Sequence, residues 1–332
     1  MSARTSVLQV LRVLVLVVLG VLPALPVHAQ TAKRYALIVT GAHGEASYAE
    51  QYAQWRQAAV TALIEKLAFG EDRIVTLFEG GDASHEATAA NVRKTLGSFK
   101  GRVNADDLVF VLLIGHGSFD GTDAKFNLVG PDLSSVEWGA LLKPIAGRVV
   151  VIDTTAASFP FLEHLAGPRR TVVTATDSVA QKFDTVFPEY FIRAWTDPGA
   201  DIDKNGRVSL WEAFTSASLG VRRYYTQRGQ LSTEHALIDD DGDGIGREAG
   251  ADGKDGSASS RLYLDPDVPG AAPTDEVILA LLQKRAALQI EVEELTQRRQ
   301  LMTREEYQQE FEKLMLDLSR VSRDIRRRQG SS

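Results

Sequence analysis

Hydrophobic segments of two kinds alternate between residues 33 and 200. Short apolar runs that end on glycine or polar residues predict buried strands, and longer segments with apolar positions three and four apart predict helices. We expect strands at 34–41, 73–80, 106–117, 148–155 and 170–176. We expect helices at 49–69, 84–99 (capped by Ser84), 134–145 and 159–166. Strands that are apolar on both faces and separated by helices predict an α/β fold, with a mostly parallel sheet covered by helices on both faces.

The carboxyl-terminal part of the chain has a different pattern. Residues 249–274 are rich in glycine, serine, proline and aspartate, which is typical of a linker. Residues 275–328 have apolar positions at alternating spacings of three and four. This spacing predicts two helices that form a hairpin or coiled coil. Such a pair either docks onto the main domain or supports self-association.

The amino-terminal residues 1–29 have the pattern of a secretory signal peptide. They begin with two arginines and no acid, continue with an apolar run, and end with the small residues Val27 and Ala29 at the cleavage positions. An uncleaved membrane anchor is the alternative. Two prolines shorten the apolar run, so we expect cleavage after Ala29 and no stable membrane anchor afterwards. The hypothesis is therefore a periplasmic or secreted protein.

Composition excludes several classes of function. The chain has 332 residues and is 44% hydrophobic, which is enough for a substantial core. The formal net charge of −7 becomes −9 when the two arginines leave with the signal peptide, so nucleic acid is not an expected partner. The chain contains no cysteine. Disulfides, a cysteine nucleophile and cysteine-bound zinc are thereby excluded.

The stretch LLIGHGSFDG places a single histidine, His116, at the end of the most hydrophobic of these strands. A histidine acts as a general base when a hydroxyl or thiol lies within hydrogen-bonding reach. The flanking glycines would allow close approach of a substrate, and the Gly117 amide could face an oxyanion. The simpler alternative is a turn histidine that bonds locally to Asp120 or Asp123.

Three segments, VFVLLIGHGSFDG, RVVVIDTTAAS and RTVVTATDS, occur in this order along the chain. Together they resemble the caspase/legumain superfamily of cysteine peptidases over residues 33–200. The resemblance implies a caspase-like domain, which we assign to residues 30–248. It also implies that His116 takes the position of the base and Gly117 that of the oxyanion donor. Asp153 then stands where an acidic residue precedes the nucleophile, and Thr155 stands where the cysteine would be.

The replacement of cysteine by threonine favours a protein without peptidase activity. A threonine hydroxyl needs stronger activation than a thiol, and its β-methyl group restricts the rotamers that can face a histidine. Thr154 and Ser158 are nearby alternatives, but the chain has no G-x-S-x-G motif around a serine. We predict a binding or scaffold module for a protein or peptide ligand. The alternative is a peptidase-like hydrolase in which His116 activates Thr155 or Ser158.

The segment DIDKNGRVSLWE, residues 201–212, fits the twelve-residue calcium-binding loop of EF-hands. Calcium prefers several hard oxygen ligands on a tight loop, and Gly206 permits the sharp turn. The alternative is a turn rich in Asp and Asn that caps the following helix. The candidate ligands at positions 1, 3, 5, 7, 9 and 12 are Asp201, Asp203, Asn205, Arg207 (through its carbonyl), Ser209 and Glu212.

A second acidic run, DDDGDGIGRE, begins at residue 239. Asp239, Asp241 and Asp243 occupy positions 1, 3 and 5, but position 12 is Gly250, and Glu248 could replace it only in a shorter loop. Consecutive acids repel one another, and a cation would relieve that repulsion. The alternative is a solvated acidic turn. We predict Ca²⁺ as a cofactor that stabilises residues 200–248, and no transition metal.

The remaining histidines are interpreted as structural. His43 ends the first strand and faces the same edge as His116, but a glycine-bounded turn is the simpler reading. We expect His164 on a helix surface and His235 at the surface or in packing contacts.

Overall fold

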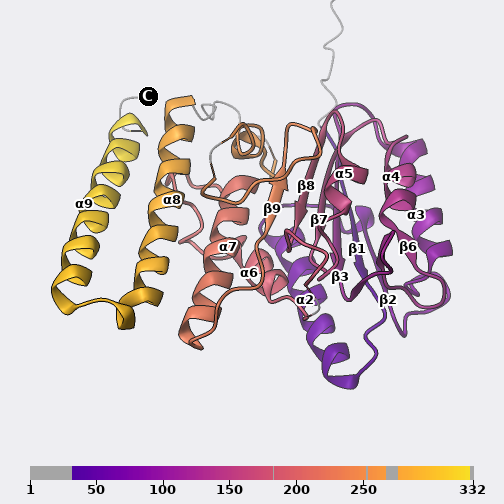
Figure 1. Cartoon of the computed structure of the whole chain (residues 1–332). Coiled ribbons are helices and arrows are strands. Elements are labelled where there is room, and N and C mark those ends of the chain that lie inside the picture. The colour runs from indigo at the N-terminus through magenta and orange to yellow at the C-terminus, as the bar shows by residue number, and fades with distance from the viewer. Residues whose placement is uncertain (1–31, 182, 252, 267–275, 330–332) are drawn as a thin grey trace, which may run out of the picture. The chain divides into compact units, whose positions relative to one another are not determined.

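We analysed a computed structural model in which residues 32–181, 183–251, 253–266 and 276–329 are described (Figure 1). Contacts divide the chain into a unit of residues 1–32 and a unit of residues 33–332, and the second unit contains the sheet and the helices. The predicted signal peptide, residues 1–29, lies outside the described residues.

A six-stranded sheet with the order β2-β1-β3-β7-β8-β9 forms the centre of this unit. The first five strands are parallel, and β9 is antiparallel to β8. The predicted mostly parallel sheet is therefore confirmed, whereas the edge strand β9 was not expected. The bounds are β1 Arg34–Thr40, β2 Ile74–Phe78, β3 Leu108–Ile114, β7 Arg148–Asp153, β8 Arg170–Thr174 and β9 Leu237–Asp239.

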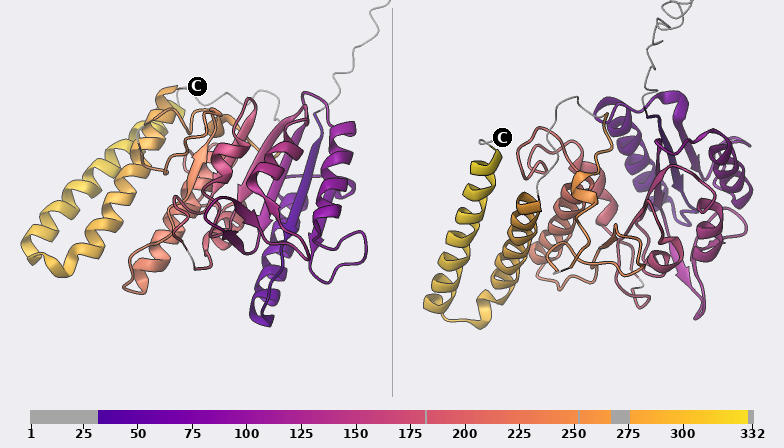
Figure 2. Two further views of the ribbon diagram at one scale, coloured as in Figure 1. Left: turned by 45° about the vertical axis from the view of Figure 1, so that its right-hand side comes forward. Right: turned by 90° about the horizontal axis from the view of Figure 1, so that it is seen from above.

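Helices cover both faces of the sheet (Figures 1 and 2). Alternate residues of each strand point to opposite faces, so Phe110 and Leu112 belong to one buried cluster while Val109 and Val111 belong to the other. The first cluster is covered by α2 Ala46–Glu65, α6 Phe187–Ala194 and α7 Leu210–Gln227. The second is covered by α3 Ala89–Arg102, α4 Ser135–Leu142 and α5 Phe161–Leu165.

One helix begins later than its sequence predicts. The helix expected at 84–99 starts at Ala89, and its cap is Thr88, whose side chain accepts a hydrogen bond from the Asn91 backbone. Ser84 instead donates its hydroxyl to Asp82 at 2.7 Å in the preceding turn. The prediction of Ser84 as the cap is wrong because Asp82 holds this segment in a local turn.

A small antiparallel sheet follows His116 directly. It has the order β4-β5-β6, with β4 Gly117–Phe119, β5 Ala124–Phe126 and β6 Leu133–Ser134. His116 thus lies at the junction between the carboxyl end of β3 and the start of β4.

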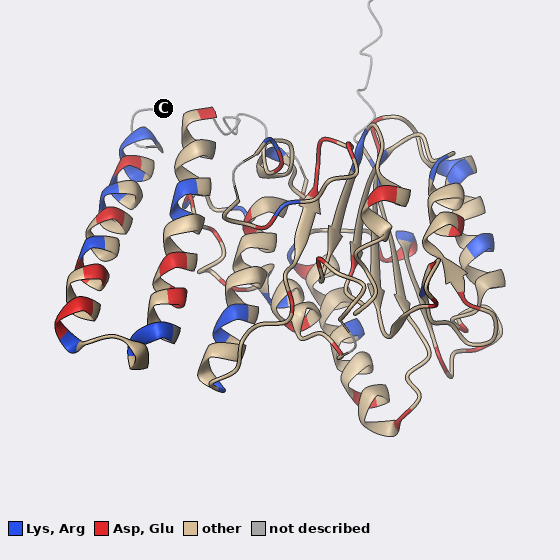
Figure 3. Ribbon diagram, viewed as in Figure 1, with Lys and Arg blue, Asp and Glu red and all other residues tan. Residues whose placement is uncertain are grey.

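The chain ends in two long helices, α8 Glu276–Arg298 and α9 Arg304–Gln329, joined through a short 3₁₀ turn at Arg299–Leu301. The two helices run antiparallel and side by side (Figure 1). Bands of acidic and basic residues alternate along α9 (Figure 3). Within the described ranges, no helix combines the length and the apolar character needed to cross a membrane.

Candidate functional site

His116 is held between two oxygen atoms at the carboxyl edge of the sheet. Its Nδ1 lies 2.7 Å from Oδ1 of Asp184, and its Nε2 lies 3.2 Å from the carbonyl oxygen of His43. The imidazole is 26% exposed and the Asp184 side chain is 40% exposed, so the pair is accessible from solvent. Asp184 was not predicted from the sequence. It lies ten residues after β8, at the same edge of the sheet.

Two tyrosines of α2 pack against this pair. The Tyr48 ring meets the imidazole edge-on, with ring centroids 4.8 Å apart, and the Tyr52 hydroxyl lies 3.3 Å from Nε2 of His116. A hydrogen bond to Asp184 raises the pKa of Tyr48, and burial raises the pKa of Tyr52. Both phenols therefore stay protonated at neutral pH, and Tyr48 donates its hydroxyl to the carboxylate of Asp184.

A second histidine–carboxylate pair lies beside the first. Nε2 of His43 is 3.1 Å from Oε2 of Glu79, and the His43 backbone N–H donates to the same oxygen at 2.9 Å. Because the carbonyl of His43 faces His116, the two pairs form one connected group. His43 is thus part of the arrangement around His116 as well as a turn residue.

The hydroxyl groups considered as nucleophiles are enclosed. Thr155 and Ser158 both have 0% exposure. Ser158 accepts hydrogen bonds from the backbone N–H groups of Ala175 and Thr176, at 3.1 and 3.3 Å. Thr155 packs against Gly117, where an added Cβ would stand 2.5 Å from the Thr155 hydroxyl oxygen. The structure therefore does not present either hydroxyl to solvent at His116.

The neighbours of these hydroxyls are also engaged in internal contacts. Oδ1 of Asp153 accepts the Thr155 backbone N–H at 2.9 Å, and Asp153 is fully buried. Burial raises the pKa of Asp153 to about 7, against the lowering effect of the hydrogen bond from the Thr155 backbone N–H. The Thr154 hydroxyl donates to the Leu113 carbonyl at 2.7 Å. Gly117 is the first residue of β4, where it pairs with Phe126.

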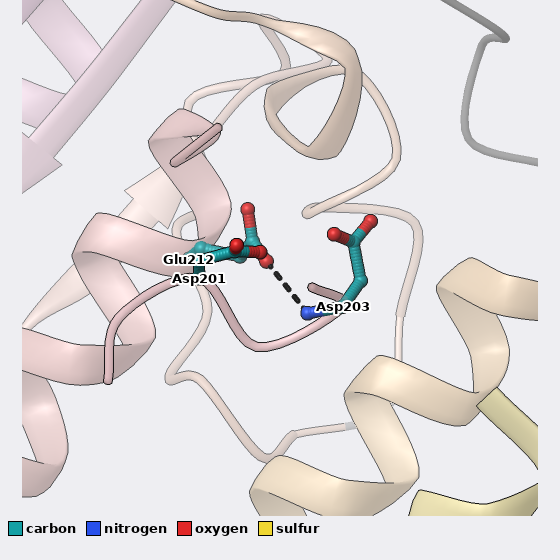
Figure 4. A group of neighbouring side chains, drawn as sticks. All are labelled: Asp201, Asp203 and Glu212. Atoms are coloured by element: carbon teal, nitrogen blue, oxygen red, sulfur yellow. Dashed lines mark hydrogen bonds between the residues drawn. The ribbon is translucent and has the colours of Figure 1, made fainter. Parts of the chain in front are cut away.

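Three carboxylates converge in the first acidic loop (Figure 4). One oxygen each of Asp201, Asp203 and Glu212 lies within 4.8 Å of the others. Asp203 is 4% exposed and Glu212 is 1% exposed. None of the three forms an ion pair with a basic side chain of the described residues. Among the described residues, these three carboxylates thus lie close together without a basic side chain at ion-pair distance.

The start of α7 closes this loop. Ser209 caps the helix, and Glu212 is its third residue, whose Oε2 accepts both the backbone N–H and the hydroxyl of Ser209 at 2.8 Å. Oε1 of Glu212 accepts the N–H groups of Ile202 and Asp203, at 2.8 and 3.1 Å. Gly206 has a φ of +85°, the left-handed conformation that glycine adopts at no steric cost.

The electrostatics of the loop follow from its burial. Burial, together with the nearby charge of Asp203, raises the pKa of Glu212 to about 7. Burial likewise raises the pKa of Asp203 to about 6, with a contribution from Asp201. Both carboxyl groups are therefore harder to ionise than they are in water.

The other predicted ligands of this loop make hydrogen bonds within the protein. Oδ1 of Asn205 accepts the Arg207 backbone N–H at 2.8 Å. The Arg207 side chain forms two hydrogen bonds of 2.8 Å with the carboxylate of Asp265. Ser209 serves as the helix cap. The structure therefore brings together the three acidic members of the predicted set and uses Asn205, Arg207 and Ser209 to shape the loop.

The second acidic loop brings together a set that differs from the predicted one. Oxygens of Asp239, Asp241 and Asp255 lie within 4.8 Å of one another. Asp243 is not part of this group, and its Oδ1 accepts the Ile245 backbone N–H at 2.7 Å. Glu248 is also engaged elsewhere, in an ion pair of 2.8 Å with Arg222.

Asp255 was missed because it lies in the segment assigned to a linker. It is 4% exposed, and burial together with the charge of Asp240 raises its pKa to about 7. Its Oδ2 lies 3.4 Å from Nε of Arg247. The available signal was the repeated pairing of aspartate and glycine in ADGKDG, which continues the pattern of the preceding acidic run.

Comparisons with known proteins give structural similarity only. No family model and no curated protein matches this chain. A solved protein structure from Geobacter sulfurreducens is similar at 16% identity, covering 62% of this chain and 92% of that one, with a TM-score of 0.40. The Drosophila initiator caspase Dronc is similar at 12% identity, covering 70% of this chain and 83% of that one, with a TM-score of 0.45.

Proposed function

We propose that this protein is an exported, calcium-stabilised binding or scaffold module, built on a caspase/legumain-like domain without peptidase activity. One observation carries the proposal. Thr155 and Ser158, the hydroxyls that His116 would have to activate, have no exposed surface. The contact of Nδ1 with Asp184 would orient a catalytic imidazole, but a nucleophile must also reach the substrate. Neither hydroxyl meets that condition.

Exposed aromatic residues that follow the carboxyl ends of three strands support a role in binding a protein or peptide. Phe119, Phe159 and Phe183 are 38%, 39% and 72% exposed. They follow the carboxyl ends of β3, β7 and β8, which lie at one edge of the parallel sheet. Phe183 precedes Asp184, the partner of His116. Aromatic residues are enriched in protein interfaces, so this edge is the surface to which we assign the ligand.

Calcium is the cofactor that best suits the acidic loops. Asp201, Asp203 and Glu212 offer hard oxygen ligands on a tight turn. Asp203 and Glu212 are buried without a basic side chain at ion-pair distance among the described residues, at a cost that a divalent cation offsets. The second loop offers the same chemistry through a different group. Its members are Asp239, Asp241 and Asp255.

The proposed location and assembly rest on the sequence. A basic start, an apolar run and small residues at the cleavage positions support export to the periplasm or beyond. Exposed Met315 and Leu316 on α9 support self-association through residues 275–328.

The proposal is tested with a peptide-library cleavage assay on the full-length protein, with and without calcium, beside the His116→Ala variant. We expect no cleavage that depends on His116. Cleavage that disappears in His116→Ala would instead support the hydrolase that uses Thr155 or Ser158.

The calcium part is tested by thermal unfolding with added calcium and with a chelator. A ligand at about one hundred times its dissociation constant stabilises the folded state by about 2.7 kcal/mol, which corresponds to a shift in Tm on the order of 5 °C for a chain of this size. We expect Asp201→Asn to reduce this shift. An unchanged Tm on chelation would contradict the assignment of calcium to either loop.

A further inference from the structure

One residue, Ile202, belongs both to the first acidic loop and to the contact with the carboxyl-terminal helices. It stands between Asp201 and Asp203, and its backbone N–H donates to Oε1 of Glu212 at 2.8 Å. Its carbonyl oxygen accepts a hydrogen bond from Arg285 of α8 at 3.0 Å. A single residue therefore connects the carboxylate group to α8 through both of its backbone polar groups.

The side chain of Ile202 makes a third connection. It is 9% exposed and packs in a small apolar cluster between α8 and α9. Among the described residues, it is the one buried member of this cluster that comes from outside the two helices. The other buried members are Ile278, Leu282, Leu288, Val321 and Ile325.

We propose that a calcium ion at Asp201, Asp203 and Glu212 controls how firmly α8 and α9 dock on the rest of the protein. The inference rests on the calcium assignment made above. Without a cation, three carboxylates in close contact repel one another, and Ile202 lies between two of them. A cation that draws the carboxylates together fixes the backbone of Ile202. The carbonyl that Arg285 binds and the side chain that the helices cover are then held in place.

The charge of Arg285 does not reverse this effect. Burial and the nearby charge of Arg326 lower the pKa of Arg285, and the negative charge of Glu212 acts against them, so Arg285 and Glu212 attract each other. A divalent cation among three carboxylates leaves the group with a net negative charge. Arg285 is therefore still attracted to the loop after calcium binds, while the position of its partner carbonyl becomes better defined.

Other contacts hold the far end of α8 independently of this loop. Arg222 and Arg223 of α7 form ion pairs with Glu294 and Glu293, at 3.5 and 3.7 Å. We therefore expect calcium to affect the part of the two helices that faces Ile202, and to leave the part near Glu293 almost unchanged. The coupling is also reciprocal, because anything that weakens docking must weaken calcium binding by the same factor.

The test is amide hydrogen exchange of the full-length protein, followed by mass spectrometry, with calcium and with a chelator. Calcium titration by calorimetry runs in parallel. We expect calcium to slow exchange at 278–288 and 321–325 by about tenfold, and exchange at 293–298 by less than about threefold.

The Ile202→Ala variant keeps the three carboxylates and the N–H bound by Glu212 but removes the side chain that the helices cover. We expect it to bind calcium more weakly and to lose the calcium-dependent slowing at 278–288. The matched control is Leu295→Ala. Leu295 lies on α8 and is 0% exposed, but it does not belong to the cluster that contains Ile202. This control variant should exchange faster overall and keep the calcium-dependent slowing.

The outcomes separate the two levels of the proposal. Calcium binding with unchanged exchange in the wild-type protein would overturn the coupling and leave the calcium assignment standing. Absence of calcium binding would overturn both. If Ile202→Ala fails to fold, Arg285→Met replaces it, because it removes the hydrogen bond to the Ile202 carbonyl, together with the charge of Arg285, and keeps the Ile202 side chain. Full calcium-dependent slowing in either variant would contradict the coupling.

Discussion

Carboxylates lie in different electrostatic environments in two regions of this protein. Around His116, Asp184 and Glu79 each face a histidine, at 2.7 and 3.1 Å, and both pairs are partly exposed. In the first acidic loop, Asp203 and Glu212 are almost fully buried and face other carboxylates. A carboxylate with a partner in the protein is electrostatically complete, whereas buried carboxylates without one are costly until a cation arrives from solution.

The second acidic loop lies between these two cases. Asp255 is as buried as Asp203, but Arg247 approaches it to 3.4 Å. Part of its charge is therefore compensated within the protein. We therefore expect changes in pH, calcium or side-chain charge to affect stability and calcium binding most in the first loop. The effect should be smaller in the second loop and smallest at the pair of His116 and Asp184.

The largest effect is expected from pH in the absence of calcium. The pKa values of Asp203 and Glu212 are raised to about 6 and about 7 in the folded protein, so the folded state holds protons that the unfolded state releases. Their contribution to stability is complete below about pH 4 and is lost as pH rises through 6 to 7. The free energy of unfolding, measured by denaturant titration with a chelator, should fall by roughly 3 kcal/mol between about pH 4.5 and 8.

The Glu212→Gln variant is the control for this pH dependence, because its side chain at position 212 stays neutral throughout. Asp153 and Asp255, whose pKa values are also raised to about 7, should preserve part of the slope. Saturating calcium binds the ionised carboxylates and should make stability rise with pH instead. The same slope in wild type and Glu212→Gln would mean that the first loop is not its main source.

An intermediate effect is expected in the second loop. Asp255→Asn removes a member of the converging group, whereas Asp243→Asn changes an exposed residue outside it. By calorimetric titration, we expect Asp255→Asn to weaken one class of calcium sites by at least about tenfold, and Asp243→Asn by less than about threefold. An equal loss of calcium affinity in the two variants would show that Asp243 is also a calcium ligand.

The smallest effect is expected at His116. Asp184→Asn keeps the shape of the side chain and removes its charge. Because the pair is partly exposed, the loss of stability should be about 1 kcal/mol or less, and the change in Tm should stay within about 3 °C. A loss of stability several times larger would contradict this prediction and would show that the charge of Asp184 matters as much as a buried charge does.

The sheet was predictable because its residues carry a local signal. Each central strand is a short apolar run, and alternate positions such as Val109 and Phe110 pack against helices on opposite faces. The edge strand β9 has only three residues and merges into an acidic run, so its apolar pattern is too short to read. The late start of α3 reflects a competing turn around Asp82, which propensity alone does not reveal.

The candidate site was predictable only where its residues are close in the sequence. The spacing of Asp201, Asp203 and Glu212 within one loop was enough to propose that they converge. Ser209 fitted two patterns at once, since the same residue starts a capping box with Glu212 and occupies a ligand position. Asp184 and Asp255 reach their partners through tertiary contacts between segments far apart in the sequence, and no local pattern connects them.

The packing of Thr155 against Gly117 also limits how this fold could be engineered. Introducing a thiol through Thr155→Cys would place it in a position with no exposed surface. The bond of 2.7 Å between His116 and Asp184 would not prevent activation of the thiol, because a carboxylate on one ring nitrogen orients a catalytic histidine. An active protease would therefore require the segment that carries Gly117 to be remodelled, so that a substrate could reach the thiol.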